Sequence, residues 1–188
     1  GIVITLQTRP TLVEFGAVAW MPSMIGIAIV REIGPVVTAL ICAGKIGSGI
    51  GAELASMKVT EQIDAMEVSG TNPFKYLVIT RVTATTLMVP VLAVLSDLIS
   101  LSGSALVELM KGGVSFELYF SRVFEYLQFG DLLPSFIKTF FFGFAIGIVG
   151  CYKGYTSTKG TEGVGRTANE AVVISSMLVF ILDFIAVL

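Results

Sequence analysis

The stretch FGAVAWMPSMIGIAIVREIGPVVTALICAGKIGSGIGAELA runs from Phe15 to Ala55 and contains only four charged residues. A helix that spans a membrane needs about 20 mostly apolar residues, at a rise of about 1.5 Å per residue. This stretch is too long for one straight span, and Pro22 and Pro35 are expected to interrupt it. We expect a bent or interfacial beginning, followed by a main span over about residues 24–54.

The composition of the whole chain supports this interpretation. Its 188 residues are 54% hydrophobic and 14% charged, against about 25% charged residues in an ordinary soluble domain. A soluble domain needs a polar surface over its core, and this chain has too few polar residues to supply one. The sequence therefore predicts an all-α, polytopic membrane protein.

Several functional classes lose support on the same grounds. The net charge of −2 gives no basic field for nucleic acid. The chain has no histidine, which excludes histidine-based catalysis and histidine-ligated metals. Cys42 and Cys151 lie far apart in apolar surroundings, so small packing residues are expected there and not a metal site. We expect no cofactor, and no catalytic residue stands out.

Three further apolar segments predict three more spans, over about residues 77–107, 133–152 and 168–188. The segment Gly1–Leu6 is expected to be the end of an earlier helix, in a protein that extends further at the N-terminus. The whole of 1–188 is then one transmembrane domain with about four full spans.

The link KVTEQIDAMEVSGTNP (Lys58–Pro73) is polar, short and orderly. We expect a short helix within residues 58–70, with Thr60 as N-cap and Gly70 near its end. One apolar stripe and one acidic face are expected on it. The stripe comprises Val59, Ile63 and Met66, and the acidic face comprises Glu61, Asp64 and Glu67.

A second link predicts an amphipathic helix over about residues 115–130, lying on the membrane surface or against a partner. Its apolar residues at helical spacing are Phe116, Phe120, Val123, Phe124 and Leu127. The distribution of Lys and Arg sets the orientation. The links that hold Lys58 and Lys75, and Lys153, Lys159 and Arg166, are the richer in positive charge and are expected in the cytoplasm. The amphipathic helix is then expected on the opposite, periplasmic side.

Glycine and serine are dense in AGKIGSGIGAELAS (Ala43–Ser56), but Gly44-Lys45 is followed by Ile46, which does not fit a phosphate-binding loop. Small residues four apart allow membrane helices to approach closely. We expect helix packing at two rows in this stretch and at a third row later in the chain. These rows contain Gly44 and Ser48, Gly47 and Gly51, and Gly143 and Gly147.

Charges inside the predicted spans include Arg31, Glu32, Asp97, Lys138 and Asp183. An unpaired charge in hydrocarbon costs several kcal/mol, so each is expected to face a cavity or a partner. Two interpretations stay open: a functional cavity that binds a ligand, favoured for Arg31 and Glu32, and mutual pairing that only holds helices together.

The stretch from Arg31 to Pro73, REIGPVVTALICAGKIGSGIGAELASMKVTEQIDAMEVSGTNP, closely resembles the signature region of the MlaE/YrbE permeases. The segments Gly143–Tyr155 and Lys159–Phe184 resemble the last two helices of that family. The resemblance covers nearly the whole chain. It implies a permease subunit of an ABC transporter that moves phospholipids between membranes together with MCE proteins.

The resemblance also implies partners and site residues. A homodimer in the inner membrane of a Gram-negative bacterium is expected, with a cytoplasmic ABC ATPase below it and a periplasmic MCE-domain protein above it. The coupling element toward the ATPase is expected at Thr60, Glu61, Gln62, Asp64 and Glu67. A lipid cavity is expected near Leu12, Phe15, Arg31, Glu32 and Ile33, with Lys138 and Asp183 in its wall.

Three alternatives to an ABC permease are left open. An ion-coupled secondary transporter could use Glu32, Lys138 and Asp183, although no internal repeat is visible. A membrane enzyme acting on lipids is the least favoured, because no histidine or acidic metal cluster supports it. A pure scaffold for a partner complex is disfavoured by the intramembrane charges.

Overall fold

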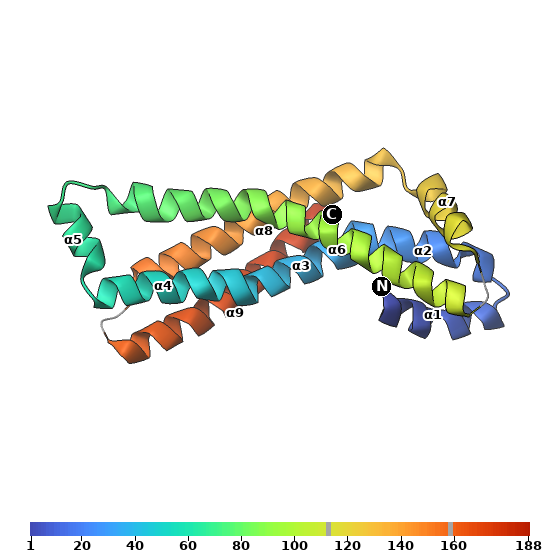
Figure 1. Cartoon of the computed structure of the whole chain (residues 1–188), viewed down its shortest axis with the longest axis horizontal. Helices are drawn as coiled ribbons and strands as arrows, with labels where there is room; N and C mark the ends of the chain where they lie inside the picture. Colours follow the sequence, from blue (N-terminus) through green and yellow to red (C-terminus); the bar gives the residue numbers. More distant parts are fainter. Residues whose placement is uncertain (112–113, 158–159) are drawn as a thin grey trace. The chain divides into compact units, whose positions relative to one another are not determined.

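The computed structural model describes residues 1–111, 114–157 and 160–188, and the side chains of Phe129 and Thr161 are not described. Lys159, which contributed to the predicted orientation, lies outside the described residues. Helices make up most of this part of the chain, and none of its residues lies in a strand. The all-α prediction is confirmed (Figure 1).

Within the described residues, four helical segments are long and apolar enough to cross a membrane, as predicted. They are Val18–Val59, Phe74–Met110, Gly130–Tyr155 and Glu162–Val187. By contact the chain divides into two compact units, which are described separately below. The first unit comprises Gly1–Pro35 and Leu92–Phe136, and the second comprises Val36–Val91 and Ile137–Leu188.

The first long segment is built from short helical pieces in sequence. They are the 3₁₀ turn η1 (Val18–Trp20), α2 (Met21–Ala28), the π-helical η2 (Ile29–Ile33), α3 (Gly34–Cys42), the π-helical η3 (Ala43–Gly47) and α4 (Ser48–Val59). Pro22 lies in the first turn of α2, where a proline N–H is not needed. Pro35 was expected to break the helix, and this is wrong. The wider π turn directly before it lets the helix continue past the proline.

In the first unit, α1 (Ile2–Glu14), α2, residues 92–110 of α6 (Thr80–Met110) and α7 (Phe116–Tyr126) surround one core. The buried residues of this core are Met21, Ile25, Ile29, Val30, Leu101, Ala105, Tyr119 and Val123. The Ser115 hydroxyl caps α7 by accepting the Leu118 N–H at 3.3 Å. Phe120 packs against the core, while Phe116 and Phe124 are exposed. The helix in the predicted 115–130 link is thus amphipathic, with Tyr119 and Val123 as its most buried residues.

The second unit contains α4, α5 (Gln62–Val68), η4 (Phe74–Ile79), residues 80–91 of α6, the end of α8 (Phe129–Tyr155) and α9 (Thr161–Val187). Two apolar clusters form its interior. One is centred on Phe142, Ile146, Val89 and Val179, and the other on Leu54, Ile63, Leu77 and Cys151. The two cysteines are free and buried.

Glycines set the spacing of the helices in the second unit. A Cβ on Gly143 would lie 2.5 Å from the Thr85 carbonyl oxygen of α6, and a Cβ on Gly147 would meet the Thr85 side chain. Gly51 lies against Ala171 of α9, and Gly47 lies against Ile146 of α8. Gly44 has open space around it within the described residues, and the Ser48 hydroxyl donates back to the Gly44 carbonyl. Of the two rows in Ala43–Ser56, therefore, the Gly47/Gly51 row makes the close helix contacts.

Candidate functional site

The π-helical segment η2 places Arg31 opposite the beginning of α8 in the first unit. The Arg31 guanidinium lies 3.5 Å from an Asp131 carboxylate oxygen, and 58% of the Arg31 side chain is exposed. Asp131 occupies the first turn of α8, where the helix dipole favours an acid. Ser135, one turn further along α8, donates a hydrogen bond of 2.6 Å to the Val30 carbonyl within η2. The site is thus a loosely paired arginine on a helix turn that a buried hydroxyl holds in place.

Asp97 of α6 lies against the same turn. A Cβ on Gly34 would collide with the Asp97 carboxylate, so the glycine makes room for this acid. One oxygen of Asp97 is buried and has no hydrogen-bond partner within the described residues. A buried polar atom of this kind usually binds water or a ligand. Together, Arg31, Asp97 and Asp131 place three charged groups around η2.

The other residues expected at the lipid cavity lie in different surroundings. Glu32 and Ile33, in the same π turn as Arg31, are half-buried. Leu12 packs against the apolar core of the first unit, and Phe15 at the end of α1 is 79% exposed. The structure therefore brings Glu32 and Ile33 to the arginine by sequence adjacency, while Leu12 is a packing residue.

Lys138 of α8 and Asp183 of α9 form a close ion pair in the second unit. The Lys138 ammonium donates to an Asp183 carboxylate oxygen at 2.9 Å. Only 7% of the Lys138 side chain and 19% of the Asp183 side chain are exposed. A cavity of about 220 Å³ adjoins the lysine and is otherwise lined by apolar residues such as Phe141 and Leu182. This geometry favours the pairing interpretation for these two charges.

The short helix α5 lies between the first two long segments (Figure 1). Ile63 is 4% exposed, and Met66 packs against the same cluster as Ile63. Glu61, Asp64 and Glu67 are exposed. The apolar stripe thus seats the helix on the second unit and leaves the acidic residues in contact with solvent.

The beginning of α5 differs from the sequence expectation. Thr60 does not cap α5: its hydroxyl donates to the Ser56 carbonyl at 2.9 Å and closes the end of α4. Glu61 is the residue before α5 and has a left-handed backbone, with φ of 57°. A side chain with a Cβ rarely adopts this conformation. The chain therefore turns sharply between two helices at an acidic residue.

The end of α5 follows the expectation from Gly70. Gly70 has φ of +81°, and its N–H donates to the Glu67 carbonyl at 3.0 Å. The Thr71 N–H donates to the Met66 carbonyl at 3.0 Å. This pair of bonds is a Schellman motif, which glycine accommodates without steric cost. Asn72 then accepts the Lys75 N–H at 3.1 Å and begins η4.

Further ion pairs of the described residues were not anticipated from the sequence. Arg9 lies 3.6 Å from Glu108, which is fully buried, and Arg81 lies 2.8 Å from Glu53. On α8 and α9, Lys153 pairs with Glu170 at 2.9 Å. The contact of Asp131 with Arg31 was not anticipated either. Glu108 and Glu53 each lie on a different helix from the arginine partner, so no spacing along the chain could reveal these pairs. Glu170 also pairs with Arg166, one turn before it on α9, at 2.9 Å.

Four helical segments of the described residues are long and apolar enough to cross a membrane, and charged side chains pair between helices, which is typical of a multi-pass membrane protein. The pattern of the family described as "Permease MlaE" matches residues 1–188. The chain belongs to the MlaE permease family.

Curated relatives agree with this membership. A probable ABC transporter permease protein of Rickettsia typhi is 40% identical over 185 residues, which cover 98% of this chain and 71% of the relative. A probable ABC transporter permease protein of the cyanobacterium Synechocystis is 35% identical over 184 residues, covering 98% of this chain and 70% of the relative. One from the alga Pyropia yezoensis is 38% identical, covering 98% and 70%.

Proposed function

We propose that this chain is the membrane subunit of an ABC transporter that moves phospholipids between the inner and outer membranes of a Gram-negative bacterium. A separate cytoplasmic ATPase subunit hydrolyses ATP. Two copies of the permease form the membrane part, and an MCE-domain protein binds on the periplasmic side. Membership of the MlaE family and the names of the relatives support the transporter class.

The construction of α5 is the observation that carries this proposal. A helix of 7 residues could not hold its shape alone in water. Here the buried Ile63, the turn at Glu61 and the Schellman stop at Gly70 fix it at both ends. An acidic, exposed surface on a rigid base suits docking into a groove of an ATPase, because movement of the ATPase then passes directly to the spans.

Arg31 is the residue proposed to attract the lipid phosphate. Its side chain is more than half exposed and its guanidinium lies 3.5 Å from Asp131, so a phosphate can compete for it. Arginine is well suited to bind phosphate, because its planar donors match two oxygens at once. Glu32 and Asp131 balance the positive charge when no lipid is bound.

The test reconstitutes the intact complex, containing the full-length chain, in vesicles and follows transfer of a fluorescent phospholipid with ATP. Arg31→Ala is expected to lower transfer about tenfold while complex assembly stays normal, which corresponds to losing one charge-assisted contact. Lys111→Ala, which removes an exposed cation, is the matched control. Normal transfer by the Arg31 variant would overturn the role proposed for it.

An ion-coupled secondary transporter is the competing function. The observation that favours it is the buried oxygen of Asp97, which has no hydrogen-bond partner in the part of the chain that the structure describes. The two functions differ in their energy source. Lipid transfer that stops when ATP is withdrawn or the ATPase subunit is removed supports the ABC permease. Transfer that continues without ATP and stops when the ion gradient is dissipated supports the alternative.

A further inference from the structure

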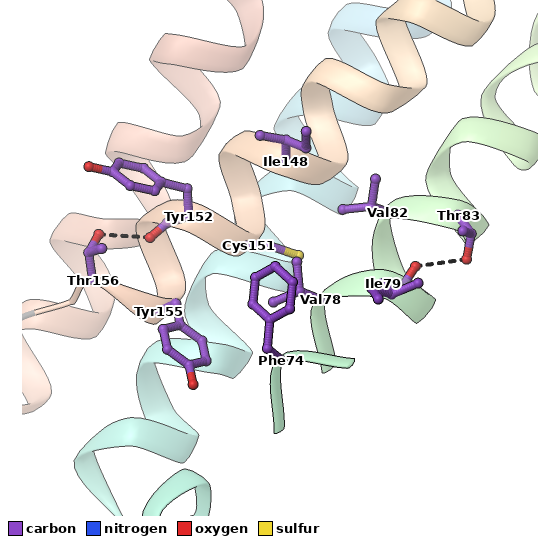
Figure 2. A pocket seen from close by; sticks show the side chains of 10 residues that line it. All are labelled: Phe74, Val78, Ile79, Val82, Thr83, Ile148, Cys151, Tyr152, Tyr155 and Thr156. Atoms are coloured by element: carbon purple, nitrogen blue, oxygen red, sulfur yellow. Dashed lines mark hydrogen bonds between the residues drawn. The ribbon is translucent and has the colours of Figure 1, made fainter. Parts of the chain in front are cut away.

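A second cavity, of about 420 Å³, lies in the second unit between the start of one span and the end of another (Figure 2). One wall is formed by residues of η4 and the first turn of α6, and the other by the last turns of α8. The lining residues are Phe74, Val78, Ile79, Val82, Thr83, Ile148, Cys151, Tyr152, Tyr155 and Thr156. Its volume falls within the range of about 300–1,000 Å³ that is usual for small-molecule sites.

The walls of this cavity present carbon atoms. The Thr83 hydroxyl donates to the Ile79 carbonyl at 2.8 Å, and the Thr156 hydroxyl donates to the Tyr152 carbonyl at 2.7 Å. Figure 2 shows the hydroxyl ends of Tyr152 and Tyr155 turned away from Cys151. The two threonine hydroxyls are therefore satisfied within their own helices and the tyrosine hydroxyls point away, so a hydrocarbon ligand covers no threonine donor that needs a partner.

Positive charge lies close to the cavity. The Lys58 ammonium donates to the carbonyl of the lining residue Tyr155 at 2.6 Å and lies 5.6 Å from the centre of its ring. Lys75 directly follows the lining residue Phe74 and is exposed. An ammonium has three donors, so Lys58 can bind an anion while it holds Tyr155. An apolar cavity within membrane-spanning helices, with two cations nearby, matches a phospholipid: one acyl chain inside and the phosphate at the lysines.

The cavity shares its walls with the seat of α5. Val78, Val82, Cys151 and Tyr155 line the cavity, and they also belong to the cluster that buries Ile63 and Met66 of α5. Protein interiors are close-packed, so a chain that fills one side of these residues limits their movement on the other side. Occupancy of the cavity and the position of α5 are thereby linked.

We propose that this cavity binds an acyl chain of a membrane phospholipid whose phosphate contacts Lys58 and Lys75, and that the bound lipid holds α5 in place. The binding part of this proposal stands without any transport activity. The effect on α5 rests on the proposed function, because it requires α5 to contact the ATPase.

The test uses the full-length permease with its ATPase in nanodiscs that contain phosphatidylglycerol with a photoreactive group near the end of one acyl chain. Cross-linked peptides are mapped by mass spectrometry. Label is expected on residues 74–83 and 148–156. Ile148→Trp and Thr83→Phe each fill the cavity from an exposed position and are expected to lower this label about tenfold. Leu87→Trp lies on α6 outside the lining, is also exposed, and is expected to leave the label unchanged.

A second experiment tests whether the lysines contact the lipid phosphate and whether anything other than lipid occupies the cavity. Lys75→Gln is expected to weaken labelling by phosphatidylglycerol severalfold in low salt, because it removes one cation near the phosphate. Label spread evenly over the exposed helix faces, and insensitive to both cavity-filling variants, would overturn the proposal. Absence of label from residues 74–83 and 148–156 would also overturn it, as is expected if the ATPase or another segment of the full-length chain fills the cavity in place of lipid.

The effect of the bound lipid on α5 is measured through the rate of ATP hydrolysis, in nanodiscs that contain increasing amounts of phosphatidylglycerol. Wild type and Leu87→Trp are expected to respond to the lipid, and the two cavity-filling variants to lose the response. A retained response in these variants overturns the link to α5 while the binding site stands. Specific lipid labelling in a complex that transfers no lipid refutes the proposed function and leaves this binding site intact.

Discussion

The Lys138 ammonium and the Asp183 carboxylate are almost entirely removed from solvent, and each compensates the charge of the other. Removing one partner leaves a buried, unpaired charge, which costs about 3–5 kcal/mol in soluble proteins. Lys138→Met and Asp183→Leu are each expected to lower thermal stability in detergent strongly. The double variant Lys138→Met/Asp183→Leu should recover most of the loss, as a double-mutant cycle would measure.

Lipid transfer by the double variant separates the two interpretations of this pair. A purely structural pair predicts that transfer returns together with stability. A pair that also forms part of the lipid cavity predicts a stable protein that transfers lipid poorly. Single variants that are as stable as the wild type would contradict the buried ion pair itself.

Gly154 is the residue at which α8 and α4 come closest in the second unit. A Cβ added there would lie 2.6 Å from the Leu54 Cβ and 2.9 Å from the Gly51 carbonyl oxygen. Overpacking of this kind usually costs about 1–3 kcal/mol, so Gly154→Ala is expected to lower the melting temperature of the purified protein.

The control for Gly154 is Gly44→Ala, in η3 directly before α4. No heavy atom lies within 4 Å of a Cβ at Gly44 among the described residues. Alanine favours a helix over glycine by about 1 kcal/mol, so this change should be neutral or stabilising. Equal effects at both positions would mean that helix propensity, and not backbone approach, sets the outcome.

At the scale of elements, α5 offers the sharpest functional test. Glu61→Lys/Asp64→Lys reverses two exposed charges without touching the buried Ile63. The variant is expected to keep its fold and lose most of the ATP-driven lipid transfer, because its docking surface now repels the site that fitted an acidic face. Transfer per ATP hydrolysed is the measurement. Glu117→Lys, an equally exposed reversal on α7, is the control.

The two ends of α5 predict opposite stability effects. Gly70 has a positive φ, so Gly70→Ala should loosen the helix end by about 1 kcal/mol. Glu61 has a positive φ with a Cβ present, so Glu61→Gly should tighten the helix start by a similar amount. Hydrogen exchange of the peptide covering residues 62–71 measures both. Faster exchange in both variants would show that the backbone conformations do not control α5.

For α5, the sequence predicted some features of the helix correctly and others not. The apolar stripe, the acidic face and the stop at Gly70 all follow from local spacing and from the freedom of glycine. The start did not follow, because Thr60 prefers the end of α4 and the turn falls on Glu61. At a junction of two helices, the local preference of Thr60 fits the end of one helix as well as the start of the next. The packing of Ile63 then determines where α5 begins.

At the candidate site, the sequence likewise identified charged residues but not the residues they pair with. Arg31, Lys138 and Asp183 stand out in a sequence because charge is rare in apolar spans. Their pairing is set by which helices lie side by side, so the contact of Arg31 with Asp131 could not be read from the chain. The helix at Pro35 was mispredicted for a related reason, because the π turn that accommodates proline carries no sequence signal of its own.

At the scale of the whole molecule, the proposed assembly makes a direct prediction. The full-length chain, purified gently from its own membrane, is expected to bring with it an ABC ATPase and phospholipid, and native mass spectrometry should show two copies of the permease. Loss of the ATPase from the complex on Glu61→Lys/Asp64→Lys would place the contact at α5. A single permease copy without any ATPase would contradict the assembly.

The glycines of α8 have a mechanical consequence for the second unit. Gly143 and Gly147 rest on the backbone of α6, while Gly150 and Gly154 rest on α4. With no side chain as a spacer on either face, a rotation of α8 by one residue would drive Phe144 and Ile148 into gaps that hold only a hydrogen atom. The three helices therefore cannot roll over one another. A displacement at one end of α8 is therefore transmitted along the helix and is not lost in rotation of the helix against α4 or α6.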